Sequence, residues 1–195
     1  MRTTTSLIER TSDRMVVLID LENELGDPDA GPEDIIAFWD AFRAHAVLLR
    51  SVDQVIVATG HRMAASAWFA LPQHGIRRLV RGGHDGADLA LLEAIDLDHY
   101  ARRFGRLVIA SGDHAFTPLA QDARRRGMTV HQVIGRGIPS RALMAACPTR
   151  TWLKLSQDAG LHAYRDRYMG ALRDWEHSAR RARAPQTGAL EASIH

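Results

Sequence analysis

Residues 15–20 read Met-Val-Val-Leu-Ile-Asp, a short continuous apolar run that ends on the carboxylate of Asp20. Such a run is typical of a strand buried on both faces of a parallel sheet. Similar runs return at residues 54–59, 76–80 and 106–111, although two arginines interrupt the run at 76–80. Because segments with helical periodicity separate these runs, the pattern predicts an α/β fold.

The rest of the chain continues this alternation. We expect a turn-rich stretch over residues 22–31, helices over 32–49, 62–71, 88–100, 116–126 and 139–146, and strands over 128–134 and 151–155. Right-handed crossovers then place helices on both faces of the sheet. The prediction is a three-layer α/β/α sandwich with a mostly parallel central sheet of about five strands. In such sheets, ligands bind beyond the carboxyl ends of the strands.

The length of 195 residues favours one domain with extensions. We expect an N-terminal extension, the α/β domain, a C-terminal helix and a disordered basic tail, over residues 1–14, 15–155, 156–178 and 179–195. A homodimer contact through aromatic side chains near the C-terminus stays open, with Trp152, Tyr168 and Trp175 as its candidates.

Composition narrows the class of protein. No apolar run approaches the roughly 18 residues needed to span a membrane, and residues 1–14 lack the apolar segment of a signal peptide. We therefore expect a cytoplasmic protein with no membrane partner. The one cysteine, Cys147, excludes an intramolecular disulfide and a zinc cluster built on several thiolates.

Three aspartates stand where this fold places a site. Asp20 ends the first strand, Asp113 follows the strand at 106–111, and Asp88 opens the helix after a glycine-rich loop. For Asp88 and Asp113, capping the following helix is an equally good explanation. Asp20 fits that explanation less well, because the next expected helix starts about a dozen residues later.

Carboxylates gathered at one sheet edge repel one another unless a cation neutralises them. Oxygen ligands with retained waters suit Mg²⁺ or Mn²⁺, which can activate a water for displacement at phosphorus. Asn23 lies three residues after Asp20 and can add a side-chain amide to the same pocket. The residues therefore indicate a metal-assisted phosphoryl chemistry.

Three blocks of sequence resemble one family. Ile19-Asp20-Leu21-Glu22-Asn23 resembles the Asp-x-x-Asn signature of NYN domains, which are PIN-like nucleases. Gly86-Ala87-Asp88 is similar to the second block of that family, and Ser111-Gly112-Asp113 to the third. The resemblance covers residues 15–155. It implies a PIN-like sheet and metal-dependent cleavage of RNA, single-stranded or structured, that leaves a 3′-hydroxyl and a 5′-phosphate.

The resemblance also implies a role for each matching residue. Asp20 and Asp113 would bind the cation, directly or through water, and Asp88 would complete the acidic set. Asn23 would orient a ligand or the scissile phosphate. The catalytic set is therefore Asp20, Asn23, Asp88 and Asp113.

Two positions depart from the family pattern. The third block usually carries a second aspartate two residues after the first, where this chain has Ala115. The family tends to have an aspartate late in the second helix, near Ala94 here. These departures leave room for a one-metal enzyme, or for a domain that binds RNA or a protein partner without cutting RNA.

Further candidates surround the predicted pocket. Asp85, Glu22 and His114 are possible additional site residues, although each is also compatible with an ordinary solvated loop or surface position. Arginine forks suit phosphate, and Arg62, Arg81 and Arg136 are candidates for nucleic-acid binding. The arginine bias of the whole chain is better explained by GC-rich codons than by function.

A phosphatase is the third alternative. Asp20 ends a strand as a phosphoaspartate nucleophile would, but the position two residues later is Glu22 rather than a second aspartate. Moreover, the only lysine, Lys154, lies outside the predicted core blocks. The residues thus favour a ribonuclease over this alternative.

Overall fold

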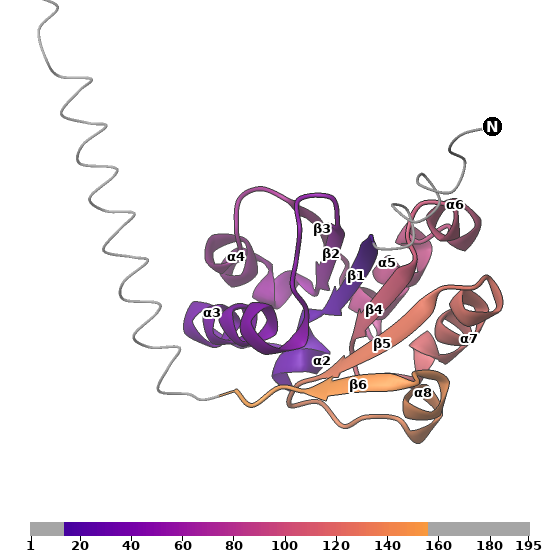
Figure 1. Cartoon of the computed structure of the whole chain (residues 1–195). Coiled ribbons are helices and arrows are strands. Elements are labelled where there is room, and N and C mark those ends of the chain that lie inside the picture. The colour runs from indigo at the N-terminus through magenta and orange to yellow at the C-terminus, as the bar shows by residue number, and fades with distance from the viewer. Residues whose placement is uncertain (1–13, 156–195) are drawn as a thin grey trace, which may run out of the picture.

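The computed structural model describes residues 14–155. Its strands form one sheet in the order β3-β2-β1-β4-β5-β6, and all neighbouring strands run parallel (Figure 1). The six strands are β1 (Met15–Asp20), β2 (Gln54–Thr59), β3 (Ile76–Val80), β4 (Arg106–Ala110), β5 (Thr129–Ile134) and β6 (Thr149–Trp152). The predicted α/β fold with a parallel sheet is confirmed, and each of the six strand ranges expected from the sequence has its counterpart in the sheet.

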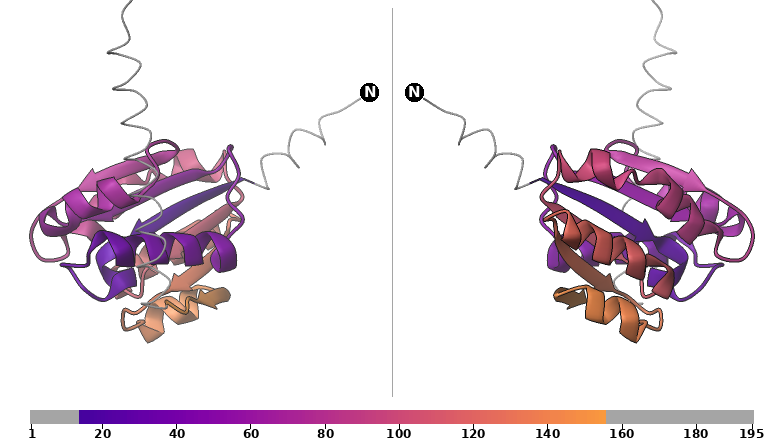
Figure 2. Two further views of the ribbon diagram at one scale, coloured as in Figure 1. Left: turned by 90° about the vertical axis from the view of Figure 1, so that its left-hand side faces the viewer. Right: turned by 90° about the vertical axis from the view of Figure 1, so that its right-hand side faces the viewer.

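Helices cover both faces of this sheet. One face carries α2 (Leu21–Leu25), α3 (Pro32–Ala41), the π-helical turn η1 (Phe42–Ala46) and α4 (His61–Ala70). The other carries α5 (Gly86–Ala94), α6 (Leu97–Ala101), the 3-10 turn η2 (His114–Phe116), α7 (Thr117–Arg125) and α8 (Arg141–Ala146). The left view of Figure 2 looks onto the layer with α3, and the right view onto the layer with α5 and α7. The predicted three-layer sandwich is therefore confirmed.

The central strand β1 contributes to two hydrophobic cores, because successive side chains of a strand point to opposite faces. Val17 and Ile19 pack with α3 and α4, whereas Val16 and Leu18 pack with α5 and α7. All four side chains are buried. Burial on both faces explains why the strand reads as a continuous apolar run rather than an alternating one.

The turn-rich stretch expected over residues 22–31 is wrong in its first part, because α2 begins directly after β1. Asp20 caps this helix, since its Oδ1 accepts a hydrogen bond from the Asn23 backbone N–H at 3.2 Å. Gly26 ends it in the left-handed conformation, with φ of 67°, which suits glycine. Asp20 therefore caps a helix that follows it directly, so the expectation that the next helix starts about a dozen residues later is also wrong.

The single helix expected over residues 88–100 is two helices. Ile95 is extended between α5 and α6, and the Asp96 side chain caps α6 by accepting hydrogen bonds from two backbone N–H groups. Because α5 begins at Gly86, Asp88 is its third residue and does not open it. The last strand is also displaced, since it begins at Thr149 rather than at residue 151.

The order of the strands reverses at β1. From β1 the chain adds β2 and β3 on one side, and then builds β4, β5 and β6 on the other side. Ligands of open parallel sheets bind at the carboxyl end of such a reversal point. Ile19 and Ala110 are partners across β1 and β4, so Asp20 and Ser111 follow at the same level of the sheet.

Candidate functional site

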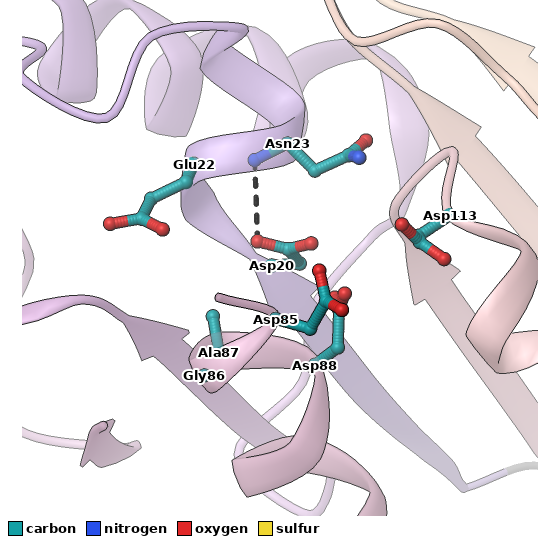
Figure 3. Close-up of a pocket in the computed structure, with 8 residues that line it drawn as sticks. All are labelled: Asp20, Glu22, Asn23, Asp85, Gly86, Ala87, Asp88 and Asp113. Atoms are coloured by element: carbon teal, nitrogen blue, oxygen red, sulfur yellow. Dashed lines mark hydrogen bonds between the residues drawn. The ribbon is translucent and has the colours of Figure 1, made fainter. Parts of the chain in front are cut away.

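The carboxyl ends of β1 and β4 border a pocket of about 250 Å³ (Figure 3). Five of its eight lining residues are carboxylates. The lining residues are Asp20, Glu22, Asn23, Asp85, Gly86, Ala87, Asp88 and Asp113. The pocket thus gathers all four members of the predicted catalytic set and two of the additional candidates, while His114 lies next to it in the chain.

Asp20 is held at the floor of this pocket by two hydrogen bonds. Its Oδ1 accepts the Asn23 backbone N–H, and its Oδ2 accepts the Ser111 hydroxyl at 3.3 Å. Only 4% of Asp20 is exposed. Capping and a site role are therefore compatible, because the cap uses one carboxylate oxygen and leaves the other toward β4 and the pocket.

The carboxyl group of Asp88 faces that of Asp20, and Figure 3 shows the Asp85 and Asp88 side chains pointing toward it. Burial raises the pKa of Asp20 well above its usual range, and hydrogen bonding and charge repulsion from Asp88 raise it further. Burial also raises the pKa of Asp88, although its hydrogen bond to Asp20 opposes part of this rise. The pair therefore holds a proton more readily than two solvated aspartates do.

One carboxyl oxygen of this pair lacks a hydrogen-bond donor among the described residues. Asp88 Oδ1 is buried and has no hydrogen-bond partner within residues 14–155. A buried carboxylate oxygen without a donor is costly, so a proton or a cation is the expected companion. Mg²⁺ is commonly held by one or two protein carboxylates together with waters and phosphate oxygens.

The donor set fits that kind of cation better than a fully protein-ligated one. In the described part of the chain, no three His, Cys, Asp or Glu side chains form a ready metal-binding cluster. Asp20 and Asp88 adjoin each other, whereas Asp113 stands on the opposite side of the pocket in Figure 3. A cation at the pair would therefore complete its coordination largely with water and ligand oxygens.

Asp113 lies at the start of η2 and caps it. Its Oδ1 accepts the Ala115 backbone N–H at 2.7 Å and lies 3.0 Å from His114 Nδ1. The His114 side chain is 83% exposed, so it stands at the rim rather than inside the pocket. The capping explanation for Asp113 is correct.

Asn23 joins two loops at the site. Its side-chain Oδ1 accepts the Gly112 backbone N–H at 2.7 Å, which fixes the loop that carries Asp113. Its backbone and side chain also pack against Gly137 so closely that a Cβ there would lie 2.3 Å from the Asn23 carbonyl oxygen. The oxygen of this amide is therefore occupied by the protein, and its NH₂ group is the part left to meet a ligand.

Glu22 and Asp85 also line the pocket. The Glu22 Oε1 accepts the Gly60 backbone N–H at 2.9 Å, which places a negative charge at the N-terminus of α4. Asp85 precedes α5 in the left-handed conformation, with φ of 55°, and its side chain makes no capping hydrogen bond. Glu22 therefore has a clear structural partner in the backbone, while the Asp85 Oδ2 lies 2.7 Å from Nδ1 of the exposed His84.

Residues 14–154 match the NYN domain. The chain belongs to the NYN domain family. The predicted family is thus confirmed, and the match covers the pocket and the whole sheet. No curated protein matches the chain in sequence.

Two solved structures are similar to this NYN domain. A protein of unknown function from Vibrio parahaemolyticus shares 13% sequence identity with a TM-score of 0.50, over 79% of this chain and 97% of that chain. The MAR1 ribonuclease from Caenorhabditis elegans shares 10% identity with a TM-score of 0.34, over 80% of this chain and 72% of that chain. The first likeness supports the fold.

The NYN domain contains two positioning residues that the sequence reasoning missed. The Ser111 hydroxyl donates to Asp20 and accepts the Asp113 backbone N–H at 3.1 Å, so it links the two strand-end aspartates. The buried Gln132 on β5 donates to the Ser111 carbonyl oxygen at 2.9 Å. Ser111 was visible as the last residue of the strand expected at 106–111, but its hydrogen bond to Asp20 depends on β4 lying beside β1.

A further buried carboxyl of the NYN domain lies in α2. Glu24 is fully buried, and neither of its carboxyl oxygens has a hydrogen-bond partner within the described residues. Burial raises the pKa of Glu24 to about 8, although the nearby Gly135 amide opposes part of this rise. Glu24 is therefore largely neutral at pH 7.

The arginines predicted to contact nucleic acid lie outside the pocket lining, and each is engaged with a carboxylate. The pairs are Arg62 with Asp29, Arg81 with Glu93 and Arg136 with Asp34. These side chains retain exposed fractions of 70%, 40% and 33%. Their contact with nucleic acid stays a prediction.

Some predictions fall outside the described residues of the NYN domain. These are the N-terminal extension up to residue 13, the C-terminal helix over 156–178, the tail over 179–195 and the dimer candidates Tyr168 and Trp175. Trp152 lies on the edge strand β6 and is 57% exposed. Between residues 14 and 155, no helix has the length and apolar character needed to cross a membrane.

Proposed function

We propose that this NYN domain is an endoribonuclease that hydrolyses RNA phosphodiester bonds with the help of Mg²⁺ or Mn²⁺. The observation that carries this proposal is the buried pair of carboxyl groups from Asp20 and Asp88, which both line the pocket and include a buried, unpartnered Asp88 oxygen. Membership of the NYN family supports RNA as the substrate.

The charge of the pocket explains why a cation is needed. The lining contains five carboxylates and no basic side chain, so a phosphodiester would be repelled. In the proposal, Asp20 and Asp88 hold the cation, and Asp113 reaches it through water. When bound, the cation would lower the pKa of a water molecule and offset charge at the scissile phosphate.

Other residues of the chain hold the carboxylates of the site in place. Ser111 keeps the Asp20 carboxylate oriented, and Asn23 holds the Gly112 backbone so that Asp113 faces the pocket. His114, exposed beside Asp113, is placed to pass a proton at the rim of the pocket. Hydrolysis would leave a 3′-hydroxyl and a 5′-phosphate.

The experiment is cleavage of single-stranded and structured RNA by the purified protein, with Mn²⁺ and with EDTA. Asp20→Asn is the diagnostic variant, because asparagine caps a helix about as well as aspartate and α2 should persist. We expect cleavage in Mn²⁺ that disappears both with EDTA and in Asp20→Asn. Cleavage that survives both conditions contradicts the proposal.

A second candidate is an RNA-binding or protein-binding module with little or no hydrolytic activity. Ala115 favours it, because the family carries a second aspartate there, and because the Ala115 backbone N–H occupies Asp113 Oδ1. RNA binding that weakens with salt, without any turnover in Mn²⁺ or Mg²⁺, would support this candidate over the nuclease.

A further inference from the structure

A second groove of about 400 Å³ lies between the edge strand β3 and helix α5. Arg77, Leu79 and Arg81 border it from the strand and its extension, as expected for alternate residues that share one face. Glu93 and Ala94 border it from the helix. No residue lines both this groove and the acidic pocket, so the two are separate features.

The groove carries a net positive charge from two arginines and one glutamate. Arg81 pairs with Glu93 at 2.7 Å, and both side chains are substantially exposed, at 40% and 67%. An exposed pair of this kind contributes little to stability, so Arg81 can exchange its partner for a phosphate. Within residues 14–155, no carboxylate forms a salt bridge with Arg77, whose side chain donates a long hydrogen bond of 3.5 Å to the Ala94 carbonyl oxygen.

Helix α5 connects the groove to the acidic pocket. Its first residues, Gly86 to Asp88, line the pocket, while Glu93 and Ala94 line the groove. At a rise of 1.5 Å per residue, Asp88 and Ala94 are separated by about 9 Å along the helix. That length corresponds to about two or three nucleotides of a stacked strand.

The packing between strand and helix fixes this spacing. A Cβ on Gly86 would lie only 2.4 Å from the Arg81 carbonyl oxygen, so the backbone after β3 presses directly on the start of α5. Arg81 in turn donates its backbone N–H to the Thr59 carbonyl oxygen at the end of β2. The arginines and the acidic pocket are therefore parts of one rigid arrangement.

We propose that this groove holds the phosphate backbone of single-stranded RNA two or so nucleotides away from the scissile bond. Arg77 and Arg81 contact the phosphates, and the apolar surface of Leu79 and Ala94 lies under the sugars or bases. The inference rests on the proposed function, because it commits to RNA as the occupant. Contacts of this kind position the strand without reading its sequence.

The experiment measures binding of a fluorescein-labelled single-stranded RNA by fluorescence polarisation, in EDTA and over a series of KCl concentrations. Arg77→Ala is compared with Arg43→Ala, which removes an exposed arginine from η1 on the other face of the sheet. We expect Arg77→Ala to weaken binding roughly fivefold and to reduce the slope of log K against log salt by about 0.7. Arg43→Ala should change neither quantity.

Glu93→Gln removes the negative charge from the same groove and should therefore change RNA affinity in the opposite direction to Arg77→Ala. We expect it to tighten RNA binding. A gain in affinity also cannot result from misfolding of the variant. The groove proposal is overturned if Arg77→Ala binds like the native protein with the same salt slope, or if the native protein binds no RNA. Parallel cleavage assays in Mn²⁺ separate the two proposals. If the native protein cleaves RNA and Arg77→Ala binds RNA as the native protein does, only the groove proposal fails. If Arg77→Ala weakens RNA binding but the native protein cleaves no RNA, only the nuclease proposal fails.

Discussion

The carboxyl groups of Asp20 and Asp88 meet at the carboxyl end of the central strand, with exposed fractions of only 4% and 6%. Two buried carboxylates in contact cannot both be charged without a compensating proton or cation. In the proposed function, this pair is the site of the cation. The consequences can be measured separately in the apo protein and in the presence of metal.

The first prediction concerns Asp88→Asn. The pKa of Asp88 is higher in the folded protein than in the unfolded chain, so the native protein loses stability as pH rises above the unfolded-state pKa. The asparagine side chain of the variant does not titrate, so the variant escapes this loss. We expect Asp88→Asn to raise the melting temperature of the apo protein at pH 8, and to abolish the further rise that Mn²⁺ gives the native protein.

Asp98→Asn is the matched control for that comparison. Asp98 is 70% exposed on α6, which precedes β4 and so lies toward the opposite edge of the sheet. Its variant should keep the native response to Mn²⁺. An equal Mn²⁺ effect on the native protein and Asp88→Asn would show that Asp88 holds no cation.

The second prediction concerns Glu24 and pH. Its pKa is raised to about 8, so the folded protein keeps a proton that the unfolded chain releases above about pH 4.5. Stability should therefore fall as pH rises from about 4.5 to 8, by on the order of 1 kcal/mol per pH unit from this group. Chemical denaturation at pH 5, 6, 7 and 8 should give a flatter profile for Glu24→Gln, which is the more stable protein at pH 8. Parallel profiles for the two proteins would mean that Glu24 is not protonated in the fold.

The position of the acidic set was predictable, because parallel strands end at the same edge and Asp20 and Asp113 each follow an apolar run. The local hydrogen bonds of each aspartate were harder to predict. Helix α2 has five residues, too few to leave a hydrophobic period, and the cap it forms with Asp20 was therefore missed. The capping residue and Gly26 were the signals that could have revealed it.

Contacts between residues far apart in the chain could not be predicted from the sequence. Asn23 and Gly112 are 89 positions apart, and their hydrogen bond exists because β4 is placed beside β1. The same holds for Ser111 and Asp20, and for the carboxylate partners of the candidate arginines. A single sequence indicates which strand ends share an edge, but not the register that brings particular side chains into contact.

The third prediction tests whether Asn23 supports the site or only meets the ligand. Asn23→Ala leaves the Gly112 N–H without its acceptor, which should reduce the free energy of unfolding by about 1–3 kcal/mol. Asn23→Asp keeps an acceptor oxygen and should recover most of that loss, while adding negative charge to the pocket. Urea denaturation measures both. A fully stable Asn23→Ala with impaired RNA binding would assign Asn23 to the ligand alone.

The fourth prediction concerns Ala115, where the family carries an aspartate. Ala115 is partly exposed at the start of η2, so a carboxylate is sterically acceptable there. If the native site works with the Asp20–Asp88 pair, Ala115→Asp should change the rate of Mn²⁺-dependent RNA cleavage by less than about tenfold, which corresponds to 1.4 kcal/mol in the barrier. A much larger gain, from a native rate near zero, would favour the binding module over the enzyme.

The most direct measurement is anomalous difference density from crystals of this protein soaked in Mn²⁺ at a concentration that supports RNA cleavage. The account predicts a peak within coordination distance of carboxylate oxygens of both Asp20 and Asp88, and no peak in crystals of Asp88→Asn treated in the same way. A map without density at this pair, or a cation bound elsewhere while RNA is cut, would contradict it.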